Sequence, residues 1–258
     1  MPRSDRYCLT VSPPTLDRTA FAELDQSLPA PQAPFARDWL MARFAEGLEI
    51  RMLRAPLSGF VAFQPGRLSW RPILGADDAV VIHSLRVAEG PKAPQAVRRL
   101  RAAVEGFARY YGYSAVLALL GSDQGLIAPN FGLGKGWIQL DEGPGEARLV
   151  GRVLQGPIAL PSLPRDWRQR AASVGPGLVV QTTGESAALN QRAERLEQAL
   201  RNRGLPARRE RFADADTARR RATHPGSVYS VVLDGIRLGG PELSEADVLR
   251  AVATTLTA

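Results

Sequence analysis

The sequence predicts an α/β protein of two domains, and three observations lead to this. The chain has 258 residues, enough for two domains that each bury a core. The stretch Ala79–Tyr113 has the pattern of a buried strand, a loop and an amphipathic helix. A proline-rich segment, GPIALPSLPRD, then precedes a second alternation of strands and helices. We therefore expect a first domain over residues 1–160, a linker over 161–173 and a second domain over 174–258.

Apolar periodicity predicts the elements of the first domain. Short apolar runs are typical of strands, and apolar residues three or four apart are typical of a helix. Clusters of proline separate the first helices from each other. Strands are expected at Arg6–Val11, Leu48–Arg54, Gly59–Phe63, Ser114–Leu120, Trp137–Leu140 and Arg148–Leu154. Helices are expected at Thr15–Leu28, at Phe35–Glu46 and over the apolar positions Val97, Leu100, Val104, Phe107, Ala108 and Tyr111.

The same patterns predict a β-α-β-α-β-β-α order in the second domain, which is enough for a small sheet with helices against it. Asp234-Gly235 is typical of a tight hairpin turn. Ser244 and Asp247 resemble a capping box at the start of the last helix. The expected elements are Gly177–Thr182, Ser186–Arg203, Ala207–Phe212, Asp214–Ala222, Val228–Leu233, Ile236–Leu238 and a helix after Ser244.

Composition narrows the class of protein. The formal net charge is +7, but all the basic residues except Lys92 and Lys135 are arginines, which is more typical of a GC-rich coding sequence than of a polyanion-binding surface. Nucleic-acid binding therefore stays a distant alternative. The single cysteine, Cys8, forms no intramolecular disulfide, which favours a reducing cytoplasm. No apolar run is long enough for a membrane span, and the N-terminus lacks the apolar core of a signal peptide.

The connection between the central strand and the helix after it is a candidate pyrophosphate site. A strand that leads through a loop into a helix aims several unpaired backbone N–H groups at one point, and this point attracts phosphate. The loop has one glycine, Gly90, so its backbone allows a less close approach than a glycine-rich loop. Lys92, Arg98 and Arg99 would lie beside the phosphates and add charge, or they belong to a solvated helix end.

Several stretches resemble GNAT-superfamily N-acyltransferases, and more narrowly bacterial GNAT proteins that carry a C-terminal YoaP-type, thioredoxin-like domain. In the first domain these stretches are FARDWLMARFAEGLEIRMLRA, GFVAFQPGRLSWRPI, VVIHSLRV and GYSAVLAL. In the second they are GLVVQTT, YSVVLDGIRLGG and the closing helix. The resemblance implies a GNAT-like mixed, largely antiparallel sheet flanked by helices, followed by a small thioredoxin-like α/β domain.

The resemblance also implies how a ligand would bind. In the superfamily, the strand that here contains Ser84–Val87 binds the pantetheine arm and polarises the thioester carbonyl with a backbone N–H, and the next loop cradles the pyrophosphate. Acetyl-CoA would then be the acyl donor for an unidentified amine, which would lose its proton to a base. The implied cofactor-binding residues are Ser84, Leu85, Arg86, Val87, Lys92, Gln95, Ala96, Val97, Arg98 and Asn130.

Three positions depart from the family pattern. Gln95 and Val97 stand where the family usually has glycines, and Gly132 stands where it usually has a general-acid tyrosine. Loss of a hydroxyl that donates a proton typically lowers the rate about 10²–10⁴-fold. In the second domain Ser186-Ala187 replaces a Cys-Pro pair, so no thiol chemistry is expected there.

Three side chains near the central strand are candidates for the acceptor side of the site. His83 alternates with Val81, Leu85 and Val87 on one predicted strand face, where it is either a general base or a hydrogen-bonded structural residue. Trp70 and Arg71 either bind an acceptor, by stacking and by gripping a carboxylate, or pack within a local turn. The two histidines and one cysteine do not have the spacing of a metal site, so no metal is expected.

Two functions follow as hypotheses. One is N-acyl transfer from acetyl-CoA to a small-molecule or protein amine, with full, reduced or lost activity. The other is a non-catalytic module that binds a protein or a small ligand on a degenerate GNAT scaffold. Edge strands of such a sheet often pair between subunits, which leaves a homodimer open. No membrane partner is expected.

Overall fold

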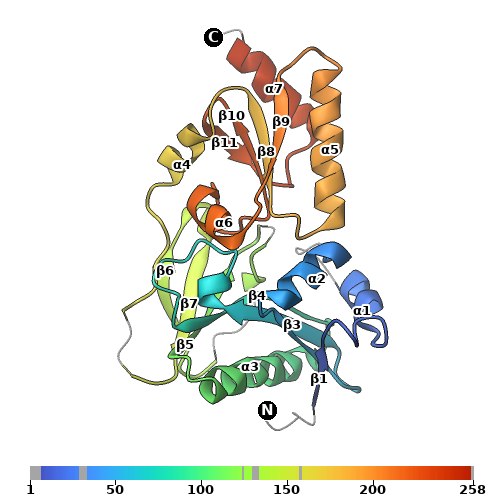
Figure 1. Cartoon of the computed structure of the whole chain (residues 1–258), viewed down its shortest axis with the longest axis vertical. Helices are drawn as coiled ribbons and strands as arrows, with labels where there is room; N and C mark the ends of the chain where they lie inside the picture. Colours follow the sequence, from blue (N-terminus) through green and yellow to red (C-terminus); the bar gives the residue numbers. More distant parts are fainter. Residues whose placement is uncertain (1–6, 29–33, 124, 130–133, 157–158, 257–258) are drawn as a thin grey trace.

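The computed structural model describes residues 7–28, 34–123, 125–129, 134–156 and 159–256, with side chains up to residue 254. Two β-sheets lie one above the other in the view of Figure 1, with the first sheet near the N-terminus and the second near the C-terminus. The chain is a mixed α/β protein, as the sequence predicts. Among the described residues, no helix combines the length and the apolar character that crossing a membrane requires.

The first sheet has seven strands in the order β1-β2-β3-β4-β5-β7-β6. All neighbouring strands are antiparallel except β4 and β5, which are parallel and joined through helix α3. The sheet is therefore mixed and largely antiparallel, as predicted. Its strands are β1 (Cys8–Val11), β2 (Glu49–Leu53), β3 (Gly59–Pro65), β4 (Ala79–Val87), β5 (Ala115–Leu120), β6 (Ile138–Glu142) and β7 (Arg148–Val153).

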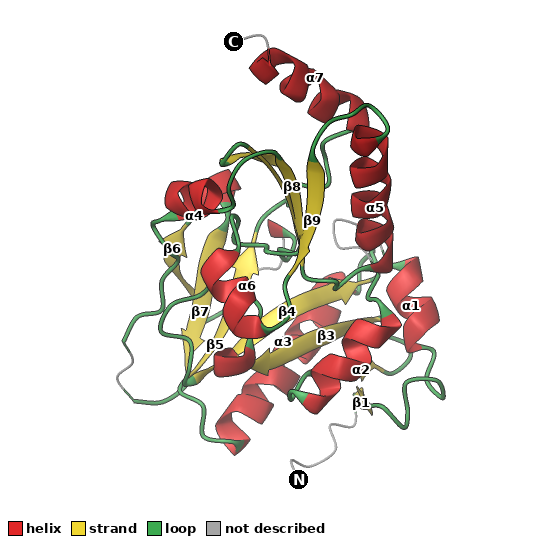
Figure 2. Cartoon of the chain, turned by 45° about the horizontal axis from the view of Figure 1, so that its top comes forward, coloured by secondary structure: helices red, strands yellow, loops and turns green. Residues whose placement is uncertain are grey.

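Helices cover both faces of this sheet (Figure 2). Helix α3 (Ala93–Tyr110) packs Leu100, Val104 and Phe107 against one face, because these residues recur at helical spacing. Helices α1 (Phe21–Ser27) and α2 (Arg37–Ala45) cover the opposite face with aromatic side chains. Short 3-10 turns, η1 (Gly66–Leu68) and η3 (Pro144–Glu146), follow β3 and β6.

The second sheet has four strands in the order β11-β10-β8-β9, in which only β8 and β9 are parallel. Helices α5 and α7 pack on one face of the sheet, while α4 packs on the opposite face. Ser244 and Asp247 form the predicted capping box, with hydrogen bonds of 3.0 and 3.1 Å between backbone N–H groups and side chains. The elements are α4 (Trp167–Ser173), β8 (Leu178–Thr182), α5 (Ala187–Arg201), β9 (Ala207–Arg211), α6 (Ala215–Arg221), β10 (Tyr229–Leu233), β11 (Ile236–Gly239) and α7 (Glu245–Leu256).

The structure differs from the predicted elements at three places. Residues 161–173, expected as a linker, contain helix α4, whose Ala171 packs on the second sheet. The helix predicted over Thr15–Leu28 is confined to α1, because residues 13–19 form turns. Tyr111, expected on the buried face of the third helix, is the C-cap of α3 and is 55% exposed.

Candidate functional site

The central strand β4 carries a β-bulge at His83. Ala62 of β3 pairs with Ser84, while the next residue, Phe63, pairs with Ile82, so His83 is an extra residue on β4. A bulge reverses the alternation of side chains that follow it. Leu85 therefore joins Ile82 in the core beneath α3. The predicted single face for His83, Val81, Leu85 and Val87 is wrong for this reason.

The bulge lies where β4 separates from β5. The parallel pairing runs from Ala79 opposite Ala115 to Ile82 opposite Ala118, and then stops. Beyond Ile82, β3 still pairs with one edge of β4, but the other edge has no strand partner in the described part of the chain. An unpaired strand edge presents backbone N–H and C=O groups to an extended ligand.

A short segment after β5 occupies part of this separation. The N–H of Ile127 donates to the carbonyl oxygen of Leu119 at 2.8 Å, and the N–H of Gly121 donates to the carbonyl oxygen of Ile127 at 2.9 Å. Since β7 pairs with the other edge of β5, Ile127 lies on the edge that faces β4. Its side chain is buried in the same core as Leu85. The sequence analysis missed this residue, because it follows the strand in a loop without periodicity.

The N-terminus of α3 offers fewer backbone donors than a glycine-rich loop. The Ala93 N–H donates to the carbonyl oxygen of Gly90 at 3.0 Å and closes a turn before the helix. Pro94 in the first helical turn has no N–H, and the Ala96 N–H donates to the carbonyl oxygen of Lys92 at 3.0 Å. Attraction of an anion to this end therefore depends more on side chains than on the backbone.

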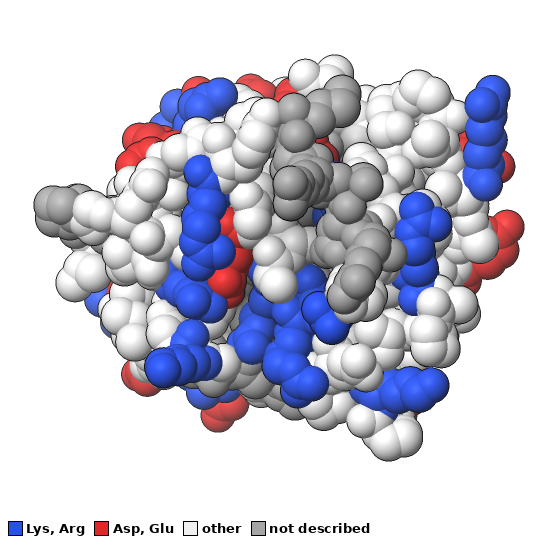
Figure 3. Space-filling model, turned by 90° about the horizontal axis from the view of Figure 1, so that it is seen from below, with Lys and Arg blue, Asp and Glu red and all other residues white. Residues whose placement is uncertain are grey.

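Basic side chains gather on the face of the molecule that α3 covers (Figure 3). Glu105 of α3 accepts hydrogen bonds from Arg152 at 2.8 Å and from Trp137 at 3.1 Å. Burial lowers the pKa of the Arg101 guanidinium, with Glu105 opposing this effect and the charges of Arg152 and Arg98 adding to it. One carboxylate thus faces several guanidinium groups, and the excess of positive charge favours an anion on this face.

The predicted cofactor-binding residues separate into two groups. Ser84, Leu85 and Arg86 of β4 are buried, and the Arg86 side chain is held by Asp25 at 2.5 Å on the face of α1. Burial raises the pKa of the Asp25 carboxyl, and the ion pair with Arg86 opposes this. The exposed group comprises Lys92, Gln95 and Arg98, while Val87 and Val97 are half-buried and Ala96 is buried. Asn130 and Gly132 lie outside the described residues.

His83 is fully buried, with an exposed fraction of 0%. Its Nε2 lies 3.3 Å from the hydroxyl oxygen of Ser69, and the carbonyl oxygen of His83 accepts a hydrogen bond from Arg71 at 3.3 Å. Burial lowers the pKa of the imidazole well below its usual value, and the charges of Arg71 and Arg43 lower it further. His83 is therefore neutral near pH 7, and the described residues cover it from solvent.

Arg71 connects the two sheets. It is 1% exposed, and its two terminal nitrogens donate to the two carboxylate oxygens of Glu185, each at 3.1 Å. The Ser227 hydroxyl donates to the carbonyl oxygen of Trp70 at 3.0 Å, and Trp70 packs against Phe212 and helix α6. Trp70 and Arg71, for which the sequence left open acceptor binding or packing within a local turn, thus contact the second half of the chain.

Buried N–H donors accumulate beside Trp70. The guanidinium carbon of Arg43 lies 4.3 Å from the centre of the Trp70 ring and 5.9 Å from that of the Trp39 ring. The indole N–H groups of both tryptophans, and Nε and Nη1 of Arg43, have no acceptor among the described residues. Such donors call for an oxygen acceptor, for which an ordered water or a carbonyl group is suited.

Asp123 and His224 form a second polar contact between the two halves. The Asp123 carboxylate lies 2.8 Å from Nε2 of His224, while Nδ1 of His224 accepts the Gly226 N–H at 3.1 Å. Nδ1 therefore holds the turn, while Nε2 faces the Asp123 carboxylate across the contact between the halves. Among the described residues, no group of three or more acidic, histidine or cysteine side chains has a metal-binding arrangement.

The similarity of this chain to known proteins is in structure and not in sequence. A scan against models of protein families and a search of curated proteins found no match. Among solved structures, the chain is similar to a ribosomal-protein-alanine N-acetyltransferase from Brucella melitensis, with 16% sequence identity and a TM-score of 0.37. The match covers 57% of this chain and 99% of the other. Because the identity and the TM-score are low, this similarity carries no conclusion about function, which we infer from the geometry of the chain itself.

Proposed function

We propose that the first half of the chain is a GNAT-type N-acyltransferase scaffold that takes an acyl group from acetyl-CoA and transfers it to an amine. The observation that carries this is the bulged end of β4, which separates from β5 after Ile82, so that the edge of β4 toward β5 has no strand partner there in the described part of the chain. An extended amide-containing arm, such as pantetheine, can add to such an edge through backbone hydrogen bonds. A thioester carbonyl held there would be polarised by a backbone N–H.

The charged face beside this edge supports the same donor. Lys92 and Arg98 are exposed at the start of α3, and the guanidinium groups around Glu105 lie further along the helix. The closed turn at Gly90 and the proline in the first turn of α3 leave fewer backbone N–H groups for phosphates. The positive side chains compensate by attracting phosphates directly. The second sheet would form a thioredoxin-like domain without redox cysteines, with the strand order β11-β10-β8-β9 as its basis.

A second candidate is a non-catalytic module that uses the scaffold for binding. It is favoured by the burial of His83 and by the contacts of Trp70 and Arg71 with the second half of the chain. A general base must reach the proton that it removes, and an acceptor must reach the thioester. In this arrangement His83 is covered from solvent, and Trp70 and Arg71 serve the contact between the halves.

Titration calorimetry with acetyl-CoA separates the two candidates. The enzyme hypothesis predicts micromolar binding to the full chain. It predicts that the double variant Lys92→Gln/Arg98→Gln weakens binding about a hundredfold or more, because it removes two charge-assisted contacts that contribute roughly 1.5–3 kcal/mol each. The matched control, Arg168→Gln/Arg195→Gln, removes the same charge from exposed positions on α4 and α5 and leaves binding within about twofold.

Absence of binding at millimolar acetyl-CoA would end the enzyme hypothesis and leave the non-catalytic module. Equal weakening in both double variants would mean that net charge, and not the α3 face, attracts the ligand. If acetyl-CoA binds, thiol release in the presence of a mixture of primary amines is the test of turnover, and binding without thiol release favours the second candidate.

A further inference from the structure

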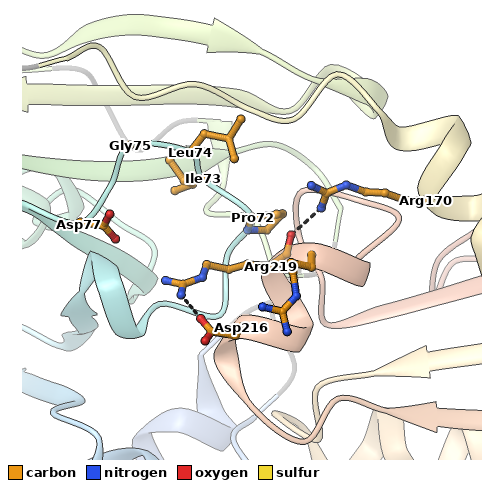
Figure 4. Close-up of a pocket in the computed structure, with 9 residues that line it drawn as sticks. Pro72, Ile73, Leu74, Gly75, Asp77, Arg170, Asp216 and Arg219 are labelled. Carbon is orange, nitrogen blue, oxygen red and sulfur yellow. Dashed lines mark hydrogen bonds and ion pairs between the residues drawn. The ribbon is translucent and has the colours of Figure 1, made fainter.

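A cavity of about 280 Å³ lies between the loop that precedes β4 and helices α4 and α6 (Figure 4). Its walls come from three segments far apart in the sequence, so only the folded chain assembles it. Neither the cofactor nor the acceptor residues predicted from the sequence line this space. The lining residues are Pro72, Ile73, Leu74, Gly75, Asp77, Arg170, Asp216, Arg219 and Arg220.

Hydrogen bonds between the segments fix the walls. Leu74 and Ser162 exchange two backbone hydrogen bonds of 2.8 and 3.1 Å, which hold the loop. Arg219 of α6 donates through Nη1 to the carbonyl oxygens of Arg67 at 2.6 Å and Gly66 at 3.2 Å. The cavity is thus formed before any ligand arrives, which lowers the entropy cost of binding.

The cations at one end of the cavity keep unused donors. Arg170 donates through Nε to Asp166 at 2.8 Å and through Nη1 to the carbonyl oxygen of Arg219 at 2.5 Å, which leaves Nη2 available. Asp216 pairs with Arg219. Arg220, which also lines the cavity, is exposed and makes no hydrogen bond or ion pair within the described part of the chain. Hydrogen bonds from Thr217 lower the pKa of the Asp214 carboxyl, and the charge of Arg220 adds to this without a direct contact, so the N–H donors of Arg220 stay available to a ligand.

The opposite end of the cavity carries a negative charge, and an apolar wall lies between the two ends. Figure 4 shows Asp77 and Arg170 at the two ends, with the segment from Pro72 to Leu74 between them. Leu74 is 52% exposed, whereas Ile73 is buried in the core. The apolar wall accommodates a hydrocarbon or a ring, while the carboxylate of Asp77 repels an anion at its own end. A bound anionic group would therefore lie toward α4 and α6.

We propose that this cavity binds a small organic molecule with one oxyanion, a carboxylate or a phosphate, on a compact apolar body. A guanidinium fork matches both oxyanions, because its parallel N–H groups meet two oxygens at once. A volume of about 280 Å³ is near the lower limit of roughly 300 Å³ for pockets that hold small ligands, so a single ring with one anionic group is the expected size.

This site is separate from the proposed acyl-CoA site. Asp77 of the cavity lies just before the first residue of β4, whereas α3, at the proposed acyl-CoA site, comes after the last residue of β4. The strand has nine residues and spans about 30 Å at roughly 3.3 Å per residue. The cavity can therefore bind its ligand whether or not acetyl-CoA binds at the other end of β4, and the reverse also holds.

Calorimetry on the full chain with four ring compounds tests this proposal. Benzoate and phenyl phosphate carry the two oxyanions, while benzyl alcohol and benzylamine are a neutral and a cationic control. We expect at least one oxyanion compound to bind in the micromolar to millimolar range. We expect both controls to bind at least about tenfold more weakly. Whichever oxyanion compound binds more tightly identifies the carboxylate or the phosphate as the preferred group.

Single substitutions locate the binding. Arg220→Gln is expected to weaken the tighter probe about tenfold, and Asp77→Asn to tighten it about twofold because repulsion is removed. Arg168→Gln, on α4 but outside the lining, is the matched control and leaves the affinity unchanged. These positions are exposed, so the folded state is retained, which far-ultraviolet circular dichroism checks.

Failure of both oxyanion compounds to bind, equal binding of benzylamine, or equal weakening by Arg220→Gln and Arg168→Gln would each overturn the proposal. Acetyl-CoA titrated into the same variants distinguishes the two sites. Arg220→Gln is expected to leave acetyl-CoA binding unchanged, so a loss of acetyl-CoA binding alone bears only on the proposed enzyme activity.

Discussion

Two strand–helix junctions of the same topology serve different purposes in this chain. In each, a strand leads through a short connection into a helix, and the next strand is parallel to the first. After β4, the connection from Ala88 to Lys92 is largely exposed, and no side chain caps α3. After β8, the connection from Thr183 to Ser186 is buried, and the Ser186 hydroxyl caps α5 by accepting the Leu189 N–H.

The difference teaches where the chain leaves backbone groups for a ligand. At the second junction, Glu185 binds Arg71, and the Glu185 carbonyl oxygen accepts the Ala36 N–H at 2.7 Å, so the first half of the chain satisfies its polar groups. At the first junction the strands β4 and β5 separate after Ile82, whereas β8 and β9 stay paired up to Thr182 and Arg211. The exposed junction suits ligand binding, and the buried one suits docking of the two halves.

The largest expected effect comes from the ion pair at the buried junction. Arg71→Met leaves Glu185 buried without a partner, and removal of one member of a buried pair typically costs about 3–5 kcal/mol. We expect denaturant unfolding at pH 7 to report a loss of this size. Lys92→Met at the exposed junction is the matched change and is expected to stay within about 0.5 kcal/mol.

A double variant sharpens this comparison. Arg71→Met/Glu185→Leu replaces both charges by apolar groups of similar size, and such replacements are often neutral in stability. Recovery of most of the loss would show that the isolated carboxylate causes it. If Arg71→Met costs less than about 1 kcal/mol, the buried junction is not anchored as described.

The second largest effect concerns pH. His83 lies at the bulge before the exposed junction, and His224 lies in a loop that faces Asp123, Arg237 and Glu242. Burial lowers the pKa of both imidazoles in the folded chain, so the unfolded chain binds protons first as pH falls below about 6.5. Stability is therefore full above about pH 6.5 and falls below it, by up to about 1.4 kcal/mol per pH unit for each histidine.

Unfolding measured between pH 7 and 5 in wild type and His224→Gln tests this. The variant introduces an amide that can donate to Asp123 and loses one titrating site, so its slope is expected to fall. Since the sequence has two histidines, the remaining slope reports His83 together with the Asp25 carboxyl, whose raised pKa acts in the opposite direction. An unchanged slope would contradict the assignment of the pH dependence to burial of His224.

The smallest effect concerns the helix caps. Ser186→Ala removes the hydroxyl that accepts the Leu189 N–H at 3.4 Å, and loss of an N-cap typically costs about 0.5–2 kcal/mol. Because this hydrogen bond is long, we expect a loss in the free energy of unfolding near the lower value of about 0.5 kcal/mol. Lys92→Ala at the corresponding position of α3 removes no cap, so its unfolding midpoint is expected to match wild type. A larger loss for Lys92→Ala would reverse the comparison.

Regular periodicity explains what could be predicted from the sequence. Leu100, Val104 and Phe107 recur at helical spacing. The capping residues Ser244 and Asp247 are three positions apart. Both features can therefore be recognised from the sequence alone. The mixed, largely antiparallel character of the first sheet follows from the family resemblance, whereas its strand order was not predicted. The predicted domain boundaries and cofactor roles stay predictions.

Features that depend on distant residues could not be predicted in this way. Arg71 and Glu185 are 114 positions apart, and no local pattern connects them. The bulge at His83 interrupts the alternation without a glycine or proline to mark it, so the strand reads as regular. Helix α4 has seven residues and follows a proline-rich stretch, and it forms because the second sheet covers it.

The extra residue in β4 also limits how this protein can vary in length. Deletion of His83 would restore regular pairing with β3 and would leave the later side chains on their present sides, because Ser84 would pair with Ala62 directly after the pair of Ile82 and Phe63. Deletion of Leu85, by contrast, would turn Arg86 into the apolar layer under α3 and away from the carboxylate of Asp25. Related chains are therefore expected to lose a residue of β4 at the bulge far more readily than beyond it.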